Sequence, residues 1–293
     1  MPTALLNGVH IYYGVTGSGF PLVWSHEFGG AYESWDAQVS YFSRRYQVIT
    51  YNDRGYPPSD VPAGDQHYSQ DQSVEDLYRL LQHLGLRQAY IGGLSMGGGL
   101  ALAFGLAHPE MARALIVAGA GTGSTDPQRF ARETSELAQR LEREGATKWA
   151  AEYAEGPTRV QLKRKDPRGW ELFKSNLAAH SAQGSAYTIR NVQGKRPALF
   201  AWEDRLRQLQ TPTLIIIGDE DEPCIEPAIF LKRRMPRSGL VVFPQSGHTV
   251  NLEEPALFNQ VVSDFLTAVE AGKWATRDPG SGVGFLAEDV ITR

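Results

Sequence analysis

The chain has 293 residues with an ordinary globular balance of 42% hydrophobic and 21% charged residues, enough for a large core in one or two domains. A formal net charge of −4 argues against nucleic acid as a partner, and no stretch approaches the roughly 18 apolar residues of a membrane span. The single cysteine, Cys224, excludes an intramolecular disulfide, and the N-terminus has no signal-peptide pattern, so we expect a cytoplasmic protein.

The first third of the chain opens with short strand-like runs at 3–8 (TALLNG), 9–15 (VHIYYGV), 21–26 (PLVWSH) and 46–53 (YQVITYND). The next segment, 73–85, places apolar side chains on one helical face. Ser73 is the N-cap that we predict for this helix, and Gly85 is the residue predicted to follow its end.

Strands and helices then alternate. Residues 87–93 (RQAYIGG) read as a strand, 96–110 as a helix that ends near its proline, and 113–121 (RALIVAGAG) as a strand. The alternation resumes with strand-like runs at 211–219 (TPTLIIIGD) and 239–247 (GLVVFPQSG), followed by a helix over 254–272. This order predicts an α/β fold with a mostly parallel sheet covered on both faces.

Residues 123–207 interrupt that alternation. Two stretches, 124–156 and 166–180, are helical in pattern with no strand between them, so we predict a helical cap, or lid, inserted into a core formed by 1–122 and 208–272. The segment holds 16 Lys and Arg against 11 Asp and Glu, a net +5. That excess indicates either a solvated helical surface or a basic lid that favours anionic substrates. The tail, 273–293, is predicted to be irregular, with no function assigned.

The glycine-rich turn Gly93-Leu94-Ser95-Met96-Gly97 lies between a predicted strand and a predicted helix. This G-x-S-x-G pattern resembles the nucleophile elbow of the α/β-hydrolase superfamily, in which a sharp turn exposes a serine above the sheet. The resemblance covers residues 1 to about 272 and implies Ser95 as the catalytic nucleophile. A serine hydroxyl needs a base oriented by an acid. His248, on the loop between the last strand and the last helix, fits the base.

The family places the acid after the strand 211–219, where "GDEDEPC" offers four carboxylates. Asp221 lies at the position of the family's acid, Asp219 is the alternative, and Glu220 and Glu222 follow them. The family's oxyanion hole implies backbone N–H donors at Met96 and Phe28. The loop "SHEFGG" resembles the family's H-G-x-x-G, with His26 as an anchor. Glu27 replaces a glycine there, so its carboxylate either lies close to the site, as a candidate substrate contact, or turns to solvent.

Serine at the elbow separates this chain from relatives that carry aspartate there, the haloalkane dehalogenases and epoxide hydrolases. The resemblance therefore implies hydrolysis of a carboxylic ester or lactone of a small molecule. A carbon–carbon hydrolase of ring-fission products, a perhydrolase and a non-catalytic ligand-binding protein are the alternatives. Neither a cofactor nor a metal is expected, and a homo-oligomer stays open. Four cap aromatics either line the substrate pocket or pack within the cap: Trp149, Tyr153, Trp170 and Tyr187.

Overall fold

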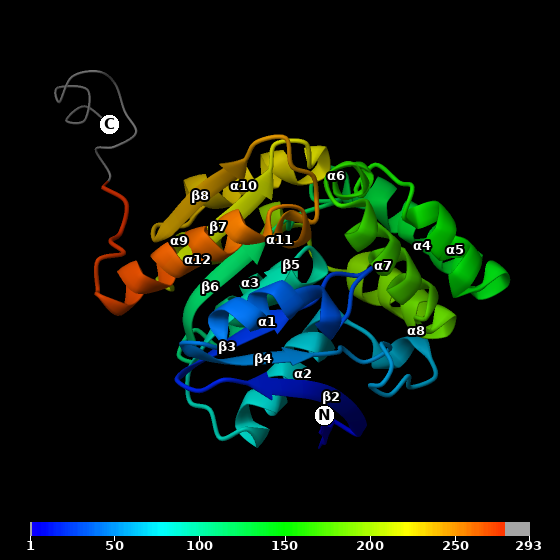
Figure 1. The fold of residues 1–293 in the computed structure, drawn as a ribbon, viewed down its shortest axis with the longest axis horizontal. Helices are drawn as coiled ribbons and strands as arrows, with labels where there is room; N and C mark the ends of the chain where they lie inside the picture. Colours follow the sequence, from blue (N-terminus) through cyan, green and yellow to red (C-terminus); the bar gives the residue numbers. More distant parts are fainter. Residues whose placement is uncertain (1, 279–293) are drawn as a thin grey trace.

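The computed structural model describes residues 2–278, and within them the core is a sheet of eight strands (Figure 1). In chain order the strands are β1 (Thr3–Leu6), β2 (Val9–Thr16), β3 (Phe20–Ser25), β4 (Tyr46–Tyr51), β5 (Ala89–Leu94), β6 (Ala112–Ala118), β7 (Thr213–Gly218) and β8 (Ser238–Phe243). Each of them falls on a run that the sequence predicts to be a strand.

The strand order is β1-β2-β4-β3-β5-β6-β7-β8. Strands β1 and β2 pair antiparallel to each other, and β2 pairs antiparallel to β4. Every pair from β4 to β8 is parallel, which confirms the mostly parallel sheet. The carboxyl ends of these parallel strands therefore meet at one edge, and the loops that leave this edge carry residues 26–30, Ser95, Asp221 and His248.

Helices cover both faces of the sheet. In β7, Leu214 and Ile216 pack into one buried cluster, and Ile215 and Ile217 pack into another, because successive side chains in a strand point to opposite faces. The helices around the sheet are η1 (Tyr32–Trp35), α1 (Asp36–Phe42), η2 (Asp65–His67), α2 (Gln70–His83), α3 (Met96–Ala107), η4 (Leu199–Trp202), α9 (Glu203–Gln208), α10 (Glu222–Arg234), α11 (Val250–Glu253) and α12 (Pro255–Glu270).

A second helical layer lies beside the sheet, drawn in green in Figure 1. Its members, here called the cap helices, are α4 (Pro127–Glu144), α5 (Ala146–Tyr153), α6 (Val160–Lys165), α7 (Pro167–Ala178), α8 (Ala182–Tyr187) and the π-helix η3 (Thr188–Gln193). They share one apolar cluster with Phe28, Tyr56 and Met96, which follow β3, β4 and β5. The cap helices therefore pack on loops at the carboxyl edge of the sheet.

The last part of the inserted segment packs differently. Leu199, Trp202 and Leu206, on η4 and α9, belong to the buried cluster of the sheet and its helices rather than to that of the cap helices. The segment thus returns to the core before β7 begins.

The start of α2 and the presence of α10 differ from the expectation. Helix α2 begins at Gln70, and its N-cap is Ser69, whose hydroxyl accepts a hydrogen bond from the Gln72 N–H at 3.1 Å. The prediction of Ser73 as N-cap is wrong, because the first turn is polar and carries no apolar periodicity. Gly85 does follow the end of the helix, with a φ of +69° that favours glycine. Helix α10 was not predicted, because Pro223 and Pro227 lie within it and proline usually indicates a turn or the end of a helix.

No helix among the described residues is long and apolar enough to cross a membrane. Of the predicted tail, residues 273–278 form neither helix nor strand, and Trp274 packs edge-on against Phe265 at 4.7 Å between ring centroids. The remainder of the tail lies outside the described residues.

Candidate active site

Ser95 occupies the sharp turn between β5 and α3. Its φ of +56° and ψ of −110° are unusual for a residue with a Cβ. The two flanking glycines make the turn sterically possible. A Cβ at Gly93 would lie 2.3 Å from the Gly97 carbonyl, and one at Gly97 would lie 2.1 Å from the Ser25 carbonyl oxygen. Backbone strain concentrated at one serine suggests a functional position.

His248 pairs with Asp221 across the loops after β8 and β7. The His248 Nδ1 lies 2.8 Å from Asp221 Oδ2, and the two side chains are 5% and 1% exposed. Asp219, the alternative carboxylate, is exposed and accepts a hydrogen bond from the Ser246 N–H at 3.1 Å. The geometry therefore brings Asp221, and not Asp219, to the histidine.

This pair has a distinctive electrostatic setting. Burial acts to lower the pKa of His248, but the charge and hydrogen bond of Asp221 outweigh it, so the pKa lies well above 6.5. Cys224 lies beside the pair, and the ligand atoms of all three residues lie within 4.8 Å of one another. Burial raises the pKa of the Cys224 thiol, which donates to the Gly119 carbonyl at 3.3 Å. Metals bind thiolates rather than thiols, so a metal fits this cluster poorly.

Two backbone N–H groups are available beside the serine. Among the described residues, neither the Phe28 N–H nor the Met96 N–H has a hydrogen-bond partner. Met96 opens α3, and the first amides of a helix lack acceptors within it. The Phe28 loop is anchored by His26, whose Nδ1 lies 2.7 Å from the Glu27 carbonyl and whose Nε2 accepts from the Asp53 N–H at 3.0 Å.

The protonation state of His26 suits this anchoring role. Burial lowers the pKa of His26 to about 4, so its ring is neutral near pH 7. A neutral imidazole has one donor and one acceptor nitrogen, which is what the carbonyl on one side and the N–H on the other require. His26 is therefore an anchor of the loop and has no free nitrogen with which to act as a base.

One cavity of about 300 Å³ is lined by both Ser95 and His248. Its apolar wall consists of Phe28, Phe130, Leu137, Tyr153, Pro157 and Ile189, and its other polar or charged lining residues are Thr122, Glu133, Thr134, Thr158, Gln193 and Arg196. No hydrogen bond joins the Ser95 hydroxyl to His248 within the described chain. Such contacts are often long in an unliganded site and shorten when substrate binds.

Of the four predicted cap aromatics, Tyr153 lines this cavity. Trp149 packs behind it, with ring centroids 4.7 Å apart. Trp170 donates its indole N–H to the Ala154 carbonyl at 2.6 Å, and Tyr187 stacks on Tyr68 at 5.0 Å. Trp149, Trp170 and Tyr187 are not among the residues that line the cavity.

Glu27 does not line the cavity either, and the expectation that it turns to solvent is wrong. Its side chain is 1% exposed and forms an ion pair with Arg159, which is 0% exposed. Arg159 is the residue before α6, so this contact joins the loop after β3 to the cap helices. The loop can keep a buried carboxylate because the cap helices supply its counter-ion.

Arg196 brings a positive charge to the cavity. Its Nη2 donates to the Thr122 carbonyl at 2.8 Å, and burial lowers the pKa of its guanidinium to about 10. Among the described residues no carboxylate forms an ion pair with it, whereas the exposed Glu133 pairs with Arg129 at 2.7 Å. Arg196 is therefore a cation in the cavity that lacks a counter-ion within the described chain.

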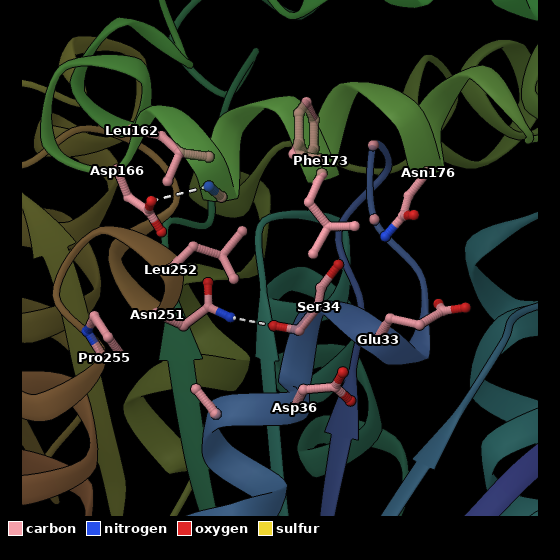
Figure 2. Close-up of a pocket in the computed structure, with 15 residues that line it drawn as sticks. Glu33, Ser34, Asp36, Leu162, Asp166, Phe173, Asn176, Asn251, Leu252 and Pro255 are labelled. Atoms are coloured by element: carbon pink, nitrogen blue, oxygen red, sulfur yellow. Dashed lines mark hydrogen bonds between the residues drawn. The ribbon is translucent and has the colours of Figure 1, made fainter.

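A second cavity of about 250 Å³ lies between the cap helices α6 and α7 and the core elements η1, α1 and α11 (Figure 2). Its polar groups serve the fold: Asp166 accepts from the Gly169 N–H at 2.9 Å at the start of α7, and Asn251 donates to the Ser34 carbonyl at 2.9 Å (Figure 2). Neither Ser95 nor His248 lines it, so the reactive groups belong to the other cavity.

Three residues near the site were missed by sequence reasoning: Arg159, Arg196 and Cys224. Both arginines lie between helices of the inserted segment. The spacing of apolar residues there does not predict which arginine or lysine side chains are buried. For Cys224 the sequence held one indication that it lies near the site, its position three residues after Asp221.

Comparisons with known proteins agree with this fold. The profile of the family described as alpha/beta hydrolase fold matches residues 21–255. A 3-oxoadipate enol-lactonase of Acinetobacter baylyi is 29% identical over 82% of this chain and 86% of the relative. A 2-hydroxymuconate semialdehyde hydrolase of Pseudomonas putida is 30% identical over 87% and 90%. The solved structure of a thermophilic esterase from Thermogutta terrifontis superposes with a TM-score of 0.83 at 26% identity, over 92% of this chain and 98% of the other. The chain belongs to the α/β hydrolase fold family.

Proposed function

We propose that this α/β hydrolase is a serine hydrolase that cleaves a carboxylic ester or lactone of a small molecule through an acyl-enzyme. One observation carries the proposal: the strained Ser95 and the buried Asp221–His248 pair come from three separate loops, and Ser95 and His248 line the same cavity. A nucleophile, a base and an acid that orients the base are the parts that acyl transfer requires.

Acylation begins when Ser95 Oγ attacks the carbonyl carbon and His248 Nε2 takes the hydroxyl proton. Asp221 holds the Nδ1 proton of the ring and stabilises the imidazolium that forms. The carbonyl electron pair moves onto oxygen, where the N–H groups of Phe28 and Met96 stabilise the negative charge. As the carbonyl re-forms, the bond to the alcohol oxygen breaks, and His248 gives its proton to that oxygen.

Deacylation repeats these steps with water. His248 takes a proton from the water as its oxygen attacks the acyl carbon, and then returns the proton to Ser95 Oγ as the acid departs. A lactone differs only in that the released alcohol remains part of the product. The cap helices act as a lid that excludes bulk water from the cavity and shapes its acyl or alcohol pocket.

Carbon–carbon bond hydrolysis is the second candidate, and the 30% identity to a 2-hydroxymuconate semialdehyde hydrolase favours it. The same Ser95, His248 and Asp221 would serve that reaction. A panel of simple esters, lactones and ring-fission products, compared by kcat/KM, separates the two candidates.

The proposal is tested with p-nitrophenyl acetate and a fluorophosphonate probe. We expect nitrophenol release above background and labelling of Ser95 alone. Ser95→Ala should lose both, with kcat lower by several orders of magnitude, about 10⁶-fold when a triad serine is removed in subtilisin. A fully active Ser95→Ala protein, or labelling at another residue, would overturn the assignment.

We further propose that the substrate carries a carboxylate at a distance from the scissile bond. Arg196 supports this, because it lines the cavity of Ser95 and has no carboxylate partner among the described residues. An arginine fork matches a carboxylate well. The names of some relatives, such as 3-oxoadipate enol-lactonase, also refer to substrates with a carboxylate.

Two methyl esters with the same five-carbon acyl chain test this substrate class: monomethyl glutarate, which is anionic, and methyl pentanoate, which is neutral. Arg196→Met should lower kcat/KM for the anionic ester by about tenfold to a hundredfold, the worth of a hydrogen bond to a charged group. The neutral ester is the control and should change by less than about twofold. Equal losses for both esters would assign Arg196 to packing instead.

A further inference from the structure

The loop that carries Phe28, residues 26–30, contacts the cap helices through a buried ion pair. The Glu27 carboxylate accepts from Nη2 of Arg159, and neither side chain reaches solvent. Among the described residues the other carboxylate oxygen, Oε1, has no hydrogen-bond partner. Arg159 is therefore the one donor that compensates this buried charge.

Arg159 is itself held rigidly by its surroundings. Its guanidinium carbon lies 5.0 Å from the centre of the Tyr153 ring and 4.6 Å from that of Phe173. Its Nη1 donates to the Thr158 carbonyl at 2.8 Å. Aromatic faces attract a guanidinium, so the rings of the cap helices help to hold it in place beside Glu27.

The orientation of the Phe28 N–H depends on the residue before it. The Glu27 carbonyl and the Phe28 N–H belong to one planar trans peptide and point in opposite directions. That carbonyl accepts from His26 Nδ1 at 2.7 Å and from the Gly30 N–H at 3.1 Å. Glu27 is thus held by the core at its carbonyl and by the cap helices at its carboxylate.

Loss of Arg159 would disturb this arrangement in a definite way. A buried carboxylate without a counter-ion is strongly unfavourable. Glu27 must then take up a proton or turn toward water, and either change removes its ion pair with the cap helices. Because the loop is short, a turn toward water also rotates the peptide between Glu27 and Phe28. The Phe28 ring adds a second link, since it contacts Trp149 and Tyr153 of the cap helices edge-on at 5.6 and 6.4 Å.

We propose that Arg159 is a positioning residue whose ion pair with Glu27 aims the Phe28 N–H at the oxyanion, so that the oxyanion hole is complete only when the cap helices are seated on the core. The inference rests on the proposed function, because it presumes that the Phe28 N–H stabilises a tetrahedral intermediate at Ser95.

The test compares kcat, KM and thermal stability in Glu27→Gln, in Arg159→Met and in the double variant Glu27→Met with Arg159→Met. Both single variants should lower kcat for p-nitrophenyl acetate by roughly tenfold to a hundredfold with little change in KM, less than the 10²–10³ loss of a whole oxyanion donor. The double variant removes both charges and keeps the volume, so it should regain the Tm but not kcat.

Arg190→Met is the matched control. Arg190 lies on η3 and also joins the cap helices to the core, through Asp65 of η2 at 3.0 Å. Among the described residues no hydrogen bond or ion pair links it to residues 26–30. Its removal should leave kcat within about twofold of the wild type. A loss of kcat equal to that of Arg159→Met would show that any cap contact matters, and would overturn the specific role of Arg159.

A transition-state analogue gives an independent measure. A trifluoromethyl ketone adds to Ser95 Oγ and places a hemiketal oxyanion in the hole. Its Ki should rise in Glu27→Gln by the same factor by which kcat/KM falls. If wild-type protein hydrolyses esters and is labelled at Ser95, yet the double variant keeps full kcat, the inference fails and the proposed function stands. If wild-type protein does neither, the proposed function itself has failed.

Discussion

At the residue scale, one hydrogen bond distinguishes the two carboxylates proposed as partners of His248. Asp221 and Asp219 are two residues apart, but Asp221 is buried and contacts the imidazole, whereas Asp219 is exposed and holds the backbone of Ser246. Asp221→Asn should lower kcat by about 10⁴, as in serine proteases, because the amide favours the wrong tautomer of the ring. Asp219→Asn should change kcat by no more than a few fold, and steady-state kinetics with p-nitrophenyl acetate distinguish the two variants. The reverse ranking would make Asp219 the acid.

The raised pKa of His248 also belongs to this scale. Only the neutral ring can accept the Ser95 proton, so kcat/KM should rise with pH through an apparent pKa above 6.5. In Asp221→Asn burial remains and the carboxylate is gone, so the residual activity should titrate at a lower pH than in the wild type. A wild-type profile whose acidic limb lies at or below pH 6.5 would contradict the assigned environment.

The same shift links activity to stability. The folded-state pKa of His248 exceeds its unfolded value, so protonation favours the folded state. This contribution is fully present below about pH 6.5 and is lost as the pH rises through the folded-state pKa. We therefore expect activity to rise over the same pH range in which His248 loses its contribution to folding.

Residues with a local signal could be predicted from the sequence, and residues without one could not. Ser95 and His248 stand out because each lies at a strand-to-helix junction with a characteristic pattern. The partner of Glu27 lies 132 residues away, and nothing in the spacing of the inserted segment marks Arg159 among its 16 cations. Contacts of this kind depend on how the cap helices seat on the core, which is a property of tertiary packing.

At the scale of elements, the strands were easy to predict and the helix boundaries were harder. Strands buried on both faces are continuous apolar runs, as in β7, where every residue is buried. Helix α2 begins with polar residues, so its start is fixed by capping rather than by periodicity. Helix α10 contains Pro227, which breaks the sequence pattern of a helix although the helix continues past it.

The start of α2 can be tested directly. Ser69→Ala removes the acceptor of the Gln72 N–H and should lower the free energy of unfolding by about 1 kcal/mol. Ser73→Ala is the control, since Ser73 lies inside the helix, and it should change this free energy by less than about 0.5 kcal/mol. Urea unfolding measures both. If Ser73→Ala lowered the free energy of unfolding more than Ser69→Ala does, Ser73 would be the N-cap, as predicted from the sequence.

At the scale of the whole molecule, the reactive groups come from the core and much of the cavity wall comes from the cap helices. Ser95, His248 and Phe28 belong to core loops, while Leu137, Tyr153 and Ile189 belong to cap helices. This division allows substrate preference to change with the cap while the chemistry stays constant. It also explains why the sequence predicts a reaction type, from motifs in the core, but no particular substrate.

Substitutions of two cap aromatics distinguish a role in substrate specificity from a role in packing. Tyr153 lines the cavity, so Tyr153→Ala should shift the ratio of kcat/KM between bulky and small esters. Its ring also contacts Arg159 and Phe28, so the variant should in addition lower kcat for p-nitrophenyl acetate, as Arg159→Met does. Trp170 is 4% exposed and lies outside that wall. Trp170→Ala should instead lower the free energy of unfolding by about 3–5 kcal/mol and leave the ratio unchanged. Kinetics on a graded ester series, together with urea unfolding, measure both effects. If Tyr153→Ala left the ratio of kcat/KM between bulky and small esters unchanged, the cap helices would not be the source of specificity. Tyr153 is the decisive position because its side chain contacts Phe28 and Arg159 and lines the cavity.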